Sequence, residues 1–290
     1  MAEGFGIATG ALSVAALFNN CVITFEYIQL GCHFGEDYER CQLKLDIAKT
    51  RLSRWGKAID IHNDPRFTIH KPQDKSSRQA QAIMEEIDLL FKTLQKASER
   101  YAIDALPEDL RLLQIEDMQP VAQKLHNRLG EIVKHRRKKT SILKKAAWAL
   151  YDGKNFDKLV GEVTGFVDSL EKLYPVEAAR RDLVRMEIEE LDEDEPSLRA
   201  LQSAAVDTDL VLSEAAAKQL ETYGGMNYAK HIHNDEEARV KVGDEWSDRA
   251  LSRSARPLST TRNGAGSVVG KGSSRTHIGN SYGGPGIFDR

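Results

Sequence analysis

Apolar residues recur at steps of three and four positions through most of the first 226 residues, a spacing that predicts amphipathic α-helices. Asp37 is the expected N-cap of one helix, and Ser76 begins a capping-box pattern before another. Helices are expected over residues 38–59, 80–101, 120–137, 141–151, 156–173, 176–194, 197–206 and 211–222. Strand-like alternation is nearly absent before residue 227, so we predict an all-α body, with a short hairpin as an open alternative between Ile103 and Met118.

The N-terminal region contains a stretch without charge from Gly4 to Phe25. As one helix it would be about 33 Å long, close to the hydrocarbon thickness of a bilayer. Asn19 and Asn20 would be costly in lipid, so a permanent membrane anchor is disfavoured. Two interpretations stay open: a buried helix at the centre of a bundle, or a helix of about residues 4–30 that leaves the bundle and enters a membrane. The apolar side chains that would enter the membrane are Phe5, Ile7, Leu12, Val14, Leu17, Phe18, Val22, Ile23 and Phe25.

The composition changes near residue 224, because 11 of the 21 glycines lie beyond residue 223. We therefore divide the chain into a helical domain of residues 1–226 and a tail of residues 227–290. The tail contains an imperfect repeat with an offset of 36 residues, whose copies cover about 227–247 and 263–283. Each copy contains a run in which small or apolar residues alternate with polar ones and which ends in glycine, a pattern typical of a β-strand and turn.

Stacking the two copies would place similar side chains on top of one another. Asn227 over Asn263 would form an amide ladder, and Asp235 over Lys271 would form an ion pair. The residues expected in the stacked core are Asn227, Ala229, Ile232, Asp235, Ala238, Val240, Val242, Gly243, Asp244, Asn263, Ala265, Val268, Lys271, Ser274, Thr276, Ile278, Gly279 and Asn280. Two layers leave both outer edges open, so we expect the tail to be disordered in a monomer and to form a β-solenoid when many chains stack. An ordinary disordered tail with chance similarity is the alternative.

Charge, cysteine content and motif spacing exclude several functional classes. The net charge of −3 argues against a general nucleic-acid binder, and three cysteines within the first 41 residues argue against a disulfide scaffold and favour the cytoplasm. The glycine-rich run over 264–272 lacks the Ser or Thr of a phosphate loop, and His231 and His233 lack the spacing of a structural metal site. We therefore expect no catalytic residues, no cofactor and no metal, and an enzyme is the least favoured class.

Two charged runs lie in the second half of the helical domain. The run over 134–145 is basic, and the run over 187–195 is acidic. Both are most simply solvated helix ends. For the basic run, contact with anionic lipids or a nuclear signal stays open, and the acidic run could face the basic one.

Several short motifs have a more specific meaning. The helical domain contains MAEGFGI at 1–7, AALFNNC at 15–21, DYERCQ at 37–42, RLSRW at 51–55 and AWALYDGK at 147–154. The tail contains EARV at 237–240, VVGKG at 268–272, IGN at 278–280 and YGGPG at 282–286. Together these motifs resemble, over the whole chain, the HET-s/HET-S family of fungal heterokaryon-incompatibility proteins, which combine a HeLo domain with a prion-forming tail.

The resemblance implies a HeLo helical bundle and a tail that converts to a β-solenoid amyloid with two layers per chain. In the family, a matching amyloid of a HET-s-like prion partner, or a NOD-like receptor with a similar motif, seeds that conversion. In pore-forming members, stacking unseats the HeLo domain, and the N-terminal helix enters the lipids of the plasma membrane, which kills the cell. The implied partners are further copies of the chain, in fibrils and in a HeLo dimer or oligomer, and the implied location is the cytoplasm until activation.

Two positions bear on the family's allelic types. Toxic members carry His at the position of His33 and prion-propagating members carry Pro, so the resemblance favours a toxic effector. Ile23 replaces an acidic residue of the family pattern. The resemblance also implies a stabilising loop after the second copy, which here contains Tyr282, Ile287 and Phe288. The alternatives are a non-toxic, self-propagating prion partner and a soluble helical adaptor with an inert tail.

Overall fold

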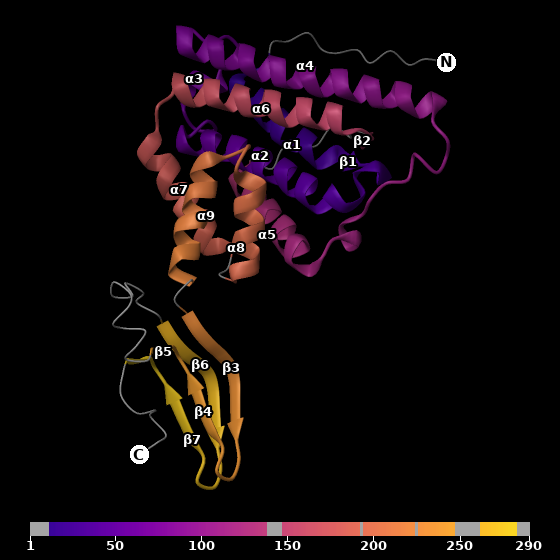
Figure 1. Ribbon diagram of the computed structural model, residues 1–290. Coiled ribbons are helices and arrows are strands. Elements are labelled where there is room, and N and C mark those ends of the chain that lie inside the picture. Colours follow the sequence, from indigo (N-terminus) through magenta and orange to yellow (C-terminus); the bar gives the residue numbers. More distant parts are fainter. Residues whose placement is uncertain (1–11, 138–146, 192–193, 224–225, 247–261, 283–290) are drawn as a thin grey trace. The chain divides into compact units, whose positions relative to one another are not determined.

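The computed structural model describes residues 12–137, 147–191, 194–223, 226–246 and 262–282 (Figure 1). The chain divides into two compact units, Met1–Ala217 and Lys218–Arg290. The composition of the sequence placed the boundary after residue 226. The difference arises because a helix, α9 (Leu210–Tyr223), continues across the division between the units.

The first unit is a helical bundle, as the sequence predicts. Its helices are α1 (Val14–Thr24), α2 (Tyr38–Ala58), α3 (Pro65–Thr68), α4 (Lys75–Asp104), α5 (Pro120–Arg136), α6 (Gly153–Leu173), α7 (Glu177–Glu190), α8 (Glu195–Ala205) and the first part of α9. Short 3-10 helices also occur in the described connections of this unit, and they are η1 (Phe25–Tyr27), η2 (Cys32–Asp37) and η3 (Ile115–Asp117).

Helix α2 is the central element of the bundle. It contacts α1, α5, α6, α7 and α8, and its apolar stripe is almost completely buried. Leu45 and Leu52 are 3% and 0% exposed, and Trp55 is 1% exposed. The steps of three and four residues place these side chains on one face, which explains why the sequence predicts this helix correctly. Figure 1 shows α2 in the interior of the unit, with α4 and α6 along one side of it.

The helix starts differ from the predicted caps. At α4, the carboxylate of Asp74 accepts a hydrogen bond from the backbone N–H of Ser77 at 2.8 Å, so Asp74, and not Ser76, is the N-cap. Asp37 precedes α2 but makes no capping hydrogen bond with its side chain. The backbone of Asp37 already has helical angles, because η2 leads directly into α2, whereas a capping residue normally has extended angles.

A short parallel sheet corrects the prediction of helix over 141–151. Strand β2 (Trp148–Leu150) pairs with β1 (Ile28–Leu30), while residues 138–146 lie outside the described part of the chain. All three residues of β2 are buried, so the alternation that marks a half-exposed strand is absent. The hairpin considered between Ile103 and Met118 is also wrong, since Leu112 instead forms an antiparallel bridge with Gly31.

The second unit contains the tail strands in parallel pairs. They are β3 (Met226–Asn234), β4 (Arg239–Val242), β5 (Glu245–Trp246), β6 (Arg262–Gly270), β7 (Arg275–Ile278) and β8 (Ser281–Tyr282). The pairs are β3 with β6, β4 with β7 and β5 with β8. The sequence predicts a disordered tail in a single chain, whereas the structure describes one chain with its two layers already paired. Backbone hydrogen bonds between the two layers hold the strands of the single chain in this paired state.

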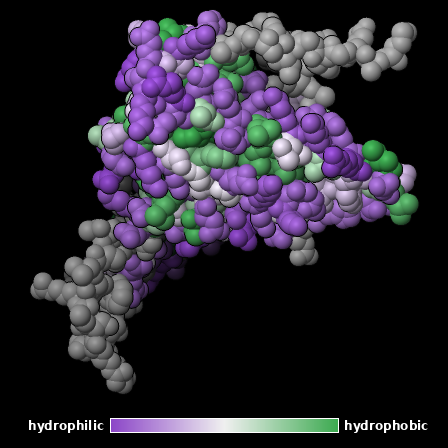
Figure 2. All heavy atoms as spheres, turned by 90° about the horizontal axis from the view of Figure 1, so that it is seen from above, coloured by the Kyte–Doolittle hydropathy of each residue, from purple (hydrophilic) through white to green (hydrophobic). Residues whose placement is uncertain are grey.

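Large hydrophobic side chains are also exposed in several places on the helical unit. Leu89, Ile103 and Leu106 are 56%, 80% and 59% exposed. Figure 2 shows that hydrophobic groups on the face seen from above are separated by hydrophilic residues. Scattered exposed apolar residues of this kind are normal for protein surfaces.

Candidate functional sites

The first candidate site is the stacking module, which we define as the described strands of residues 226–246 and 262–282. Its register pairs residues that are 36 positions apart, as the repeat in the sequence predicts. The pairs include Asn227 with Asn263, Ala229 with Ala265, Ile232 with Val268, Arg239 with Arg275, Val240 with Thr276, Val242 with Ile278, and Trp246 with Tyr282. The module therefore consists of two similar layers.

Backbone hydrogen bonds join the two layers along their length. The N–H of Lys271 donates to the carbonyl of Asn234 at 2.8 Å, and the N–H of Gly279 donates to the carbonyl of Val242 at 2.9 Å. Each described tail strand pairs with one other strand, so every strand has one edge whose N–H and C=O groups are open. Open strand edges of this kind are templates for another chain.

A network of amide groups connects the layers and also crosses each layer. The side-chain amide of Asn227 donates to Oδ1 of Asn263 at 2.9 Å, which is the predicted ladder, and also to Oδ1 of Asp244 at 3.0 Å. In the second layer, Asn263 donates to Oδ1 of Asn280 at 2.9 Å. The contacts within a layer join residues 17 positions apart, and the repeat offset of 36 gives no signal for them.

Backbone geometry restricts two pairs of equivalent positions. Gly243 and Gly279 have φ angles of 153° and 157°, and a Cβ atom on Gly243 would lie 2.0 Å from the carbonyl oxygen of Gly279. In the turns before β4 and β7, Glu236 and Gly272 both have left-handed angles, with φ of 57° and 66°. Glycine adopts these angles without strain, whereas Glu236 does not.

The predicted ion pair between the layers is wrong for this form of the module. Within the described residues, no ion pair joins Asp235 to Lys271; the Asp235 carboxylate instead lies 3.5 Å from Nε2 of His233. Both predicted partners follow the ends of their strands, where side chains are exposed and not held by the ladder. By contrast, Ile232 and Asn234, which belong to β3 itself, are buried, with exposures of 6% and 3%.

Much apolar surface of the module stays open. Val268, Ile278 and Tyr282 are 45%, 40% and 52% exposed, so two layers bury only part of the predicted core. The predicted loop residues Ile287 and Phe288 lie outside the described residues. The remaining core positions, Ala229, Ala238, Val240, Val242, Ala265, Ser274 and Thr276, are half-buried or exposed.

The second candidate site is the place where α1 packs into the helical unit. Val14, Leu17, Phe18, Val22 and Ile23 are buried, with exposures between 0% and 7%. The Phe18 ring contacts the rings of Trp55 and His62, at centroid distances of 6.2 Å and 5.7 Å. Burying side chains of this size contributes about 2 kcal/mol each, so α1 is a main part of the core.

Polar contacts fix α1 against α4. Nδ2 of Asn20 donates to Oδ1 of Asp88 at 3.1 Å, and Sγ of Cys21 lies 3.5 Å from the carbonyl oxygen of Met84. Just after α1, the Phe25 ring packs edge-on against Phe91 at 5.1 Å. Asn20, one of the two asparagines that argue against a permanent membrane anchor, thus has a role in the packed state.

The described part of the N-terminal region is shorter than the predicted helix of residues 4–30. Helix α1 has 11 residues and ends at Thr24, where η1 and β1 take over. Leu12 precedes α1 and is 48% exposed, and Phe5 and Ile7 lie outside the described residues. Over the described ranges, no helix is both long and apolar enough to cross a bilayer.

The two positions linked to allelic type lie on different elements. Ile23 is buried on α1 with 7% exposure. His33 belongs to η2, and its side chain is 45% exposed. Nε2 of His33 lies 3.2 Å from the hydroxyl of Tyr101 and 3.7 Å from the carboxylate of Asp109. His33 therefore connects η2 to the end of α4 and to the loop that follows it.

A buried ion network that no pattern in the sequence predicts joins α2 to α7 and to the start of α9. Arg54 is 1% exposed; its guanidinium pairs with Glu187 and lies 2.7 Å from the Asp209 carboxylate. Burial alone would lower the pKa of Arg54, but the two carboxylates raise it above its ordinary value. Arg136, from the basic run, also pairs with Glu187 at 2.5 Å, so one residue of each charged run does meet the other.

Two known protein families match the two parts of the chain separately. A family model described as HeLo, prion-inhibition and propagation, matches residues 6–201, and a model described as Het-s 218-289 matches residues 219–283. The heterokaryon incompatibility proteins s and S of Podospora anserina are each 52% identical to the chain over 289 residues, which is 100% of both chains in each case.

Solved structures extend the similarity to three dimensions. The HET-S N-terminal domain superposes with a TM-score of 0.73 at 54% identity, covering 76% of this chain and 98% of that one. A double variant of the HET-s N-terminal domain gives a TM-score of 0.71 at 54% identity, with coverages of 72% and 99%.

Proposed function

Since the chain belongs to the HeLo family of fungal heterokaryon-incompatibility prion proteins, we propose that it is a cell-death effector of the HET-S type. Templated stacking of the tail activates it, and the N-terminal segment then inserts into a membrane. The observation that carries the proposal is the register of the stacking module, in which every described tail strand pairs with its counterpart 36 residues away and keeps one edge open.

Activation begins at the open edges of the module. A matching amyloid, from a HET-s-like prion partner or from a NOD-like receptor with a similar motif, presents strands with the same register. Adding a layer satisfies the exposed backbone groups and covers Val268 and Ile278. The chain acts by assembly and not by catalysis.

Strain then passes along α9 into the helical domain. Helix α9 ends at Tyr223, and β3 begins at Met226, so stacking of β3 acts directly on the end of α9. At the start of the same helix, Asp209 is held by Arg54 of α2. Trp55 and Gly56, the next residues of α2, contact Phe18 of α1. Helix α2 therefore connects the start of α9 to α1.

Release of α1 exposes the apolar side chains that it buries in the bundle. Outside the bundle these side chains need a new apolar environment, and the lipids of the plasma membrane supply one. The protein therefore lies in the cytoplasm until activation and relocates to the membrane afterwards. Residues 1–25 contribute the inserted segment.

The test is dye leakage from liposomes that contain anionic lipids. Full-length protein seeded with fibres of residues 227–290 should release the dye, and unseeded protein should not. Protein that lacks residues 1–25 should still join fibres but release no dye; leakage from this variant would overturn the membrane step.

The competing function is a non-toxic prion partner that triggers a separate effector. Two observations favour the toxic type: His33 is present, and its ring lies 3.2 Å from the Tyr101 hydroxyl, a contact that proline cannot make. The variant His33→Pro should abolish seeded leakage while leaving fibre formation by the tail intact. Seeded wild-type protein that forms fibres without leakage would instead identify the chain as the prion partner.

A further inference from the structure

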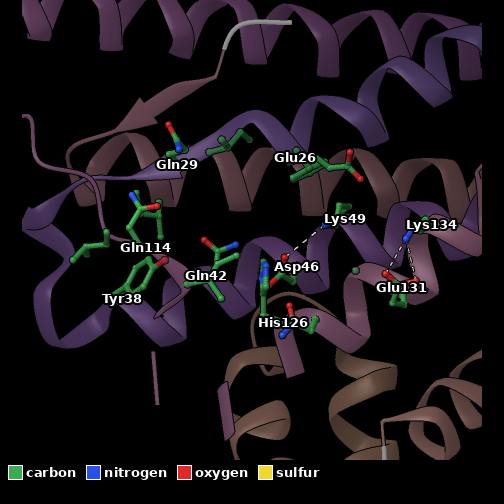
Figure 3. Close-up of a pocket in the computed structure, with 17 residues that line it drawn as sticks. Glu26, Gln29, Tyr38, Gln42, Asp46, Lys49, Gln114, His126, Glu131 and Lys134 are labelled. Carbon is green, nitrogen blue, oxygen red and sulfur yellow. Dashed lines mark hydrogen bonds and ion pairs between the residues drawn. The ribbon is translucent and has the colours of Figure 1, made fainter. Parts of the chain in front are cut away.

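A polar pocket of about 400 Å³ lies in the helical unit, next to the segment that follows α1. Four stretches of chain line it: residues 25–30, α2, residues 113–115 and α5. Figure 3 shows the side chains from these stretches that surround the pocket, with Asp46 between Lys49 and His126. A volume of this size is typical of sites that hold small organic molecules.

The most unusual lining group is the ammonium of Lys49. Its side chain is 8% exposed, and its ionic contact with Oδ1 of Asp46 is long, at 3.7 Å. The other oxygen of Asp46 is held by Nδ1 of His126 at 2.7 Å. Lys49 makes no hydrogen bond to a described residue, although an ammonium can donate three. A buried cation with unused donors is costly unless an acceptor occupies the space beside it.

Other donors line the same pocket. Tyr38 lies two helical turns before Asp46, and burial, followed by the carboxylates of Asp117 and Asp46, raises the pKa of its phenol to about 12. The phenol is therefore protonated at neutral pH and can donate. The amides of Gln29 and Gln42 also line the pocket, and neither they nor the Tyr38 hydroxyl make a hydrogen bond to a described residue.

The remaining charges at the pocket are already balanced. Glu26 pairs with Arg137 at 2.9 Å, and Glu131 pairs with Lys134 at 3.1 Å. Asp46 is bound by His126, which leaves Lys49 as the cation with the weakest partner among these groups.

A glycine keeps the pocket open. Gly130 lies on the wall of the pocket in the interior of α5, where glycine is unfavourable for a helix. A Cβ atom at Gly130 would meet nothing within 4 Å, so no steric conflict requires glycine there. A larger side chain at this position would grow into the pocket.

We propose that this pocket binds a small organic anion whose carboxylate or phosphate pairs with Lys49, while Tyr38, Gln29 and Gln42 donate to other polar atoms of the molecule. The apolar side chains of Phe25, Ile28 and Ile115 cover the body of the molecule. The ligand joins residues 25–30, directly after α1, to α2 and α5. Bound ligand therefore holds the packed state of α1 and slows its release; this second effect rests on the proposed function, whereas binding does not.

The test is thermal unfolding of the unseeded full-length protein with benzoate, phenyl phosphate or inorganic phosphate as probes. At about ten times its dissociation constant, a bound probe should raise the unfolding temperature by about 4 °C. The shift should disappear in Lys49→Met and in Gly130→Leu, where a side chain fills the pocket. It should persist in Lys57→Met, which removes an exposed lysine of the same helix.

Two results overturn the proposal: no shift with any of the three probes, or a shift that persists in both Lys49→Met and Gly130→Leu. Because the unfolding experiment uses neither seeds nor membranes, its failure is distinct from a failure of the proposed function. If binding occurs, the same probe should also slow seeded dye leakage of the wild type and leave that of Gly130→Leu unchanged.

Discussion

Gly56 of α2 lies so close to the ring of Phe18 in α1 that a Cβ atom on Gly56 would be 2.3 Å from Cζ of Phe18. The Phe18 ring is 1% exposed and also contacts Trp55 and His62. The packed position of α1 therefore depends on the absence of a side chain at position 56. Since α1 is the segment that the proposed mechanism releases, this contact is the most direct place to test it.

We expect Gly56→Ala to lower the free energy of unfolding of the helical domain by about 2 kcal/mol, because the added methyl group displaces the Phe18 ring. The unfolding temperature should fall by about 5 °C, and liposome leakage should begin without seeds. Gly161→Ala in α6 is the control, since a Cβ atom there meets nothing within 4 Å. Equal unfolding temperatures for the two variants would show that α1 does not depend on Gly56.

The ion network at the start of α9 gives a second prediction. Asp209→Asn removes a buried carboxylate that lies 2.7 Å from the Arg54 guanidinium and should cost about 3 kcal/mol in urea unfolding. Seeded leakage should also become slower, because in the proposed mechanism strain from α9 reaches α2 through this pair. Asp207→Asn is the matched control: this carboxylate is 64% exposed and should contribute at most about 1 kcal/mol. Similar losses for both variants would contradict a special role of the buried pair.

In the stacking module, Gly243→Ala should stop fibre growth by the isolated tail. The added Cβ atom would lie 2.0 Å from the carbonyl oxygen of Gly279, so the two layers could not approach to normal distance. Thioflavin fluorescence and electron microscopy of residues 227–290 would measure the effect. Ser273→Ala, at an exposed position of the second layer, should form fibres at the wild-type rate. Normal fibres from Gly243→Ala would exclude the described register.

The two turns of the module allow substitutions with opposite effects. Glu236→Gly should raise the denaturant resistance of tail fibres by about 1 kcal/mol per chain, because Glu236 has a left-handed φ of 57°. Gly272→Ala should lower it by a similar amount, since the equivalent turn has φ of 66°. The guanidinium midpoint of fibre dissociation is the measurement. If the midpoints of both variants shift in the same direction, the turns in the fibre do not have the left-handed backbone angles described here.

The long helices and the stacked tail could be predicted from sequence because both repeat a simple pattern. The apolar stripe from Tyr38 to Ile59 matches α2, and the 36-residue offset matches the strand pairs. Strand β2 could not be predicted in this way, since its three residues are buried on both faces and show no alternation.

Other features depend on contacts that no local pattern reveals. Arg54 lies outside the apolar stripe, and its partners Glu187 and Asp209 are 133 and 155 residues away. The prediction of an ion pair between Asp235 and Lys271 assumed that the strand register alone fixes the positions of charged side chains. Exposed side chains at strand ends can pair with other neighbours, and here Asp235 pairs with His233. The register of the strands can thus be predicted from the sequence, whereas the partners of buried ions can be identified only from the three-dimensional structure.

The central claim is that each chain adds two successive layers to a growing fibre. The most direct test is the mass per unit length of unstained fibres of residues 227–290, measured by scanning transmission electron microscopy. With a layer spacing of about 4.8 Å, two layers per chain predict one chain for about every 9.6 Å of fibre. One chain for every 4.8 Å would mean that each chain forms a single layer, and it would contradict the pairing of Asn227 with Asn263 within one chain.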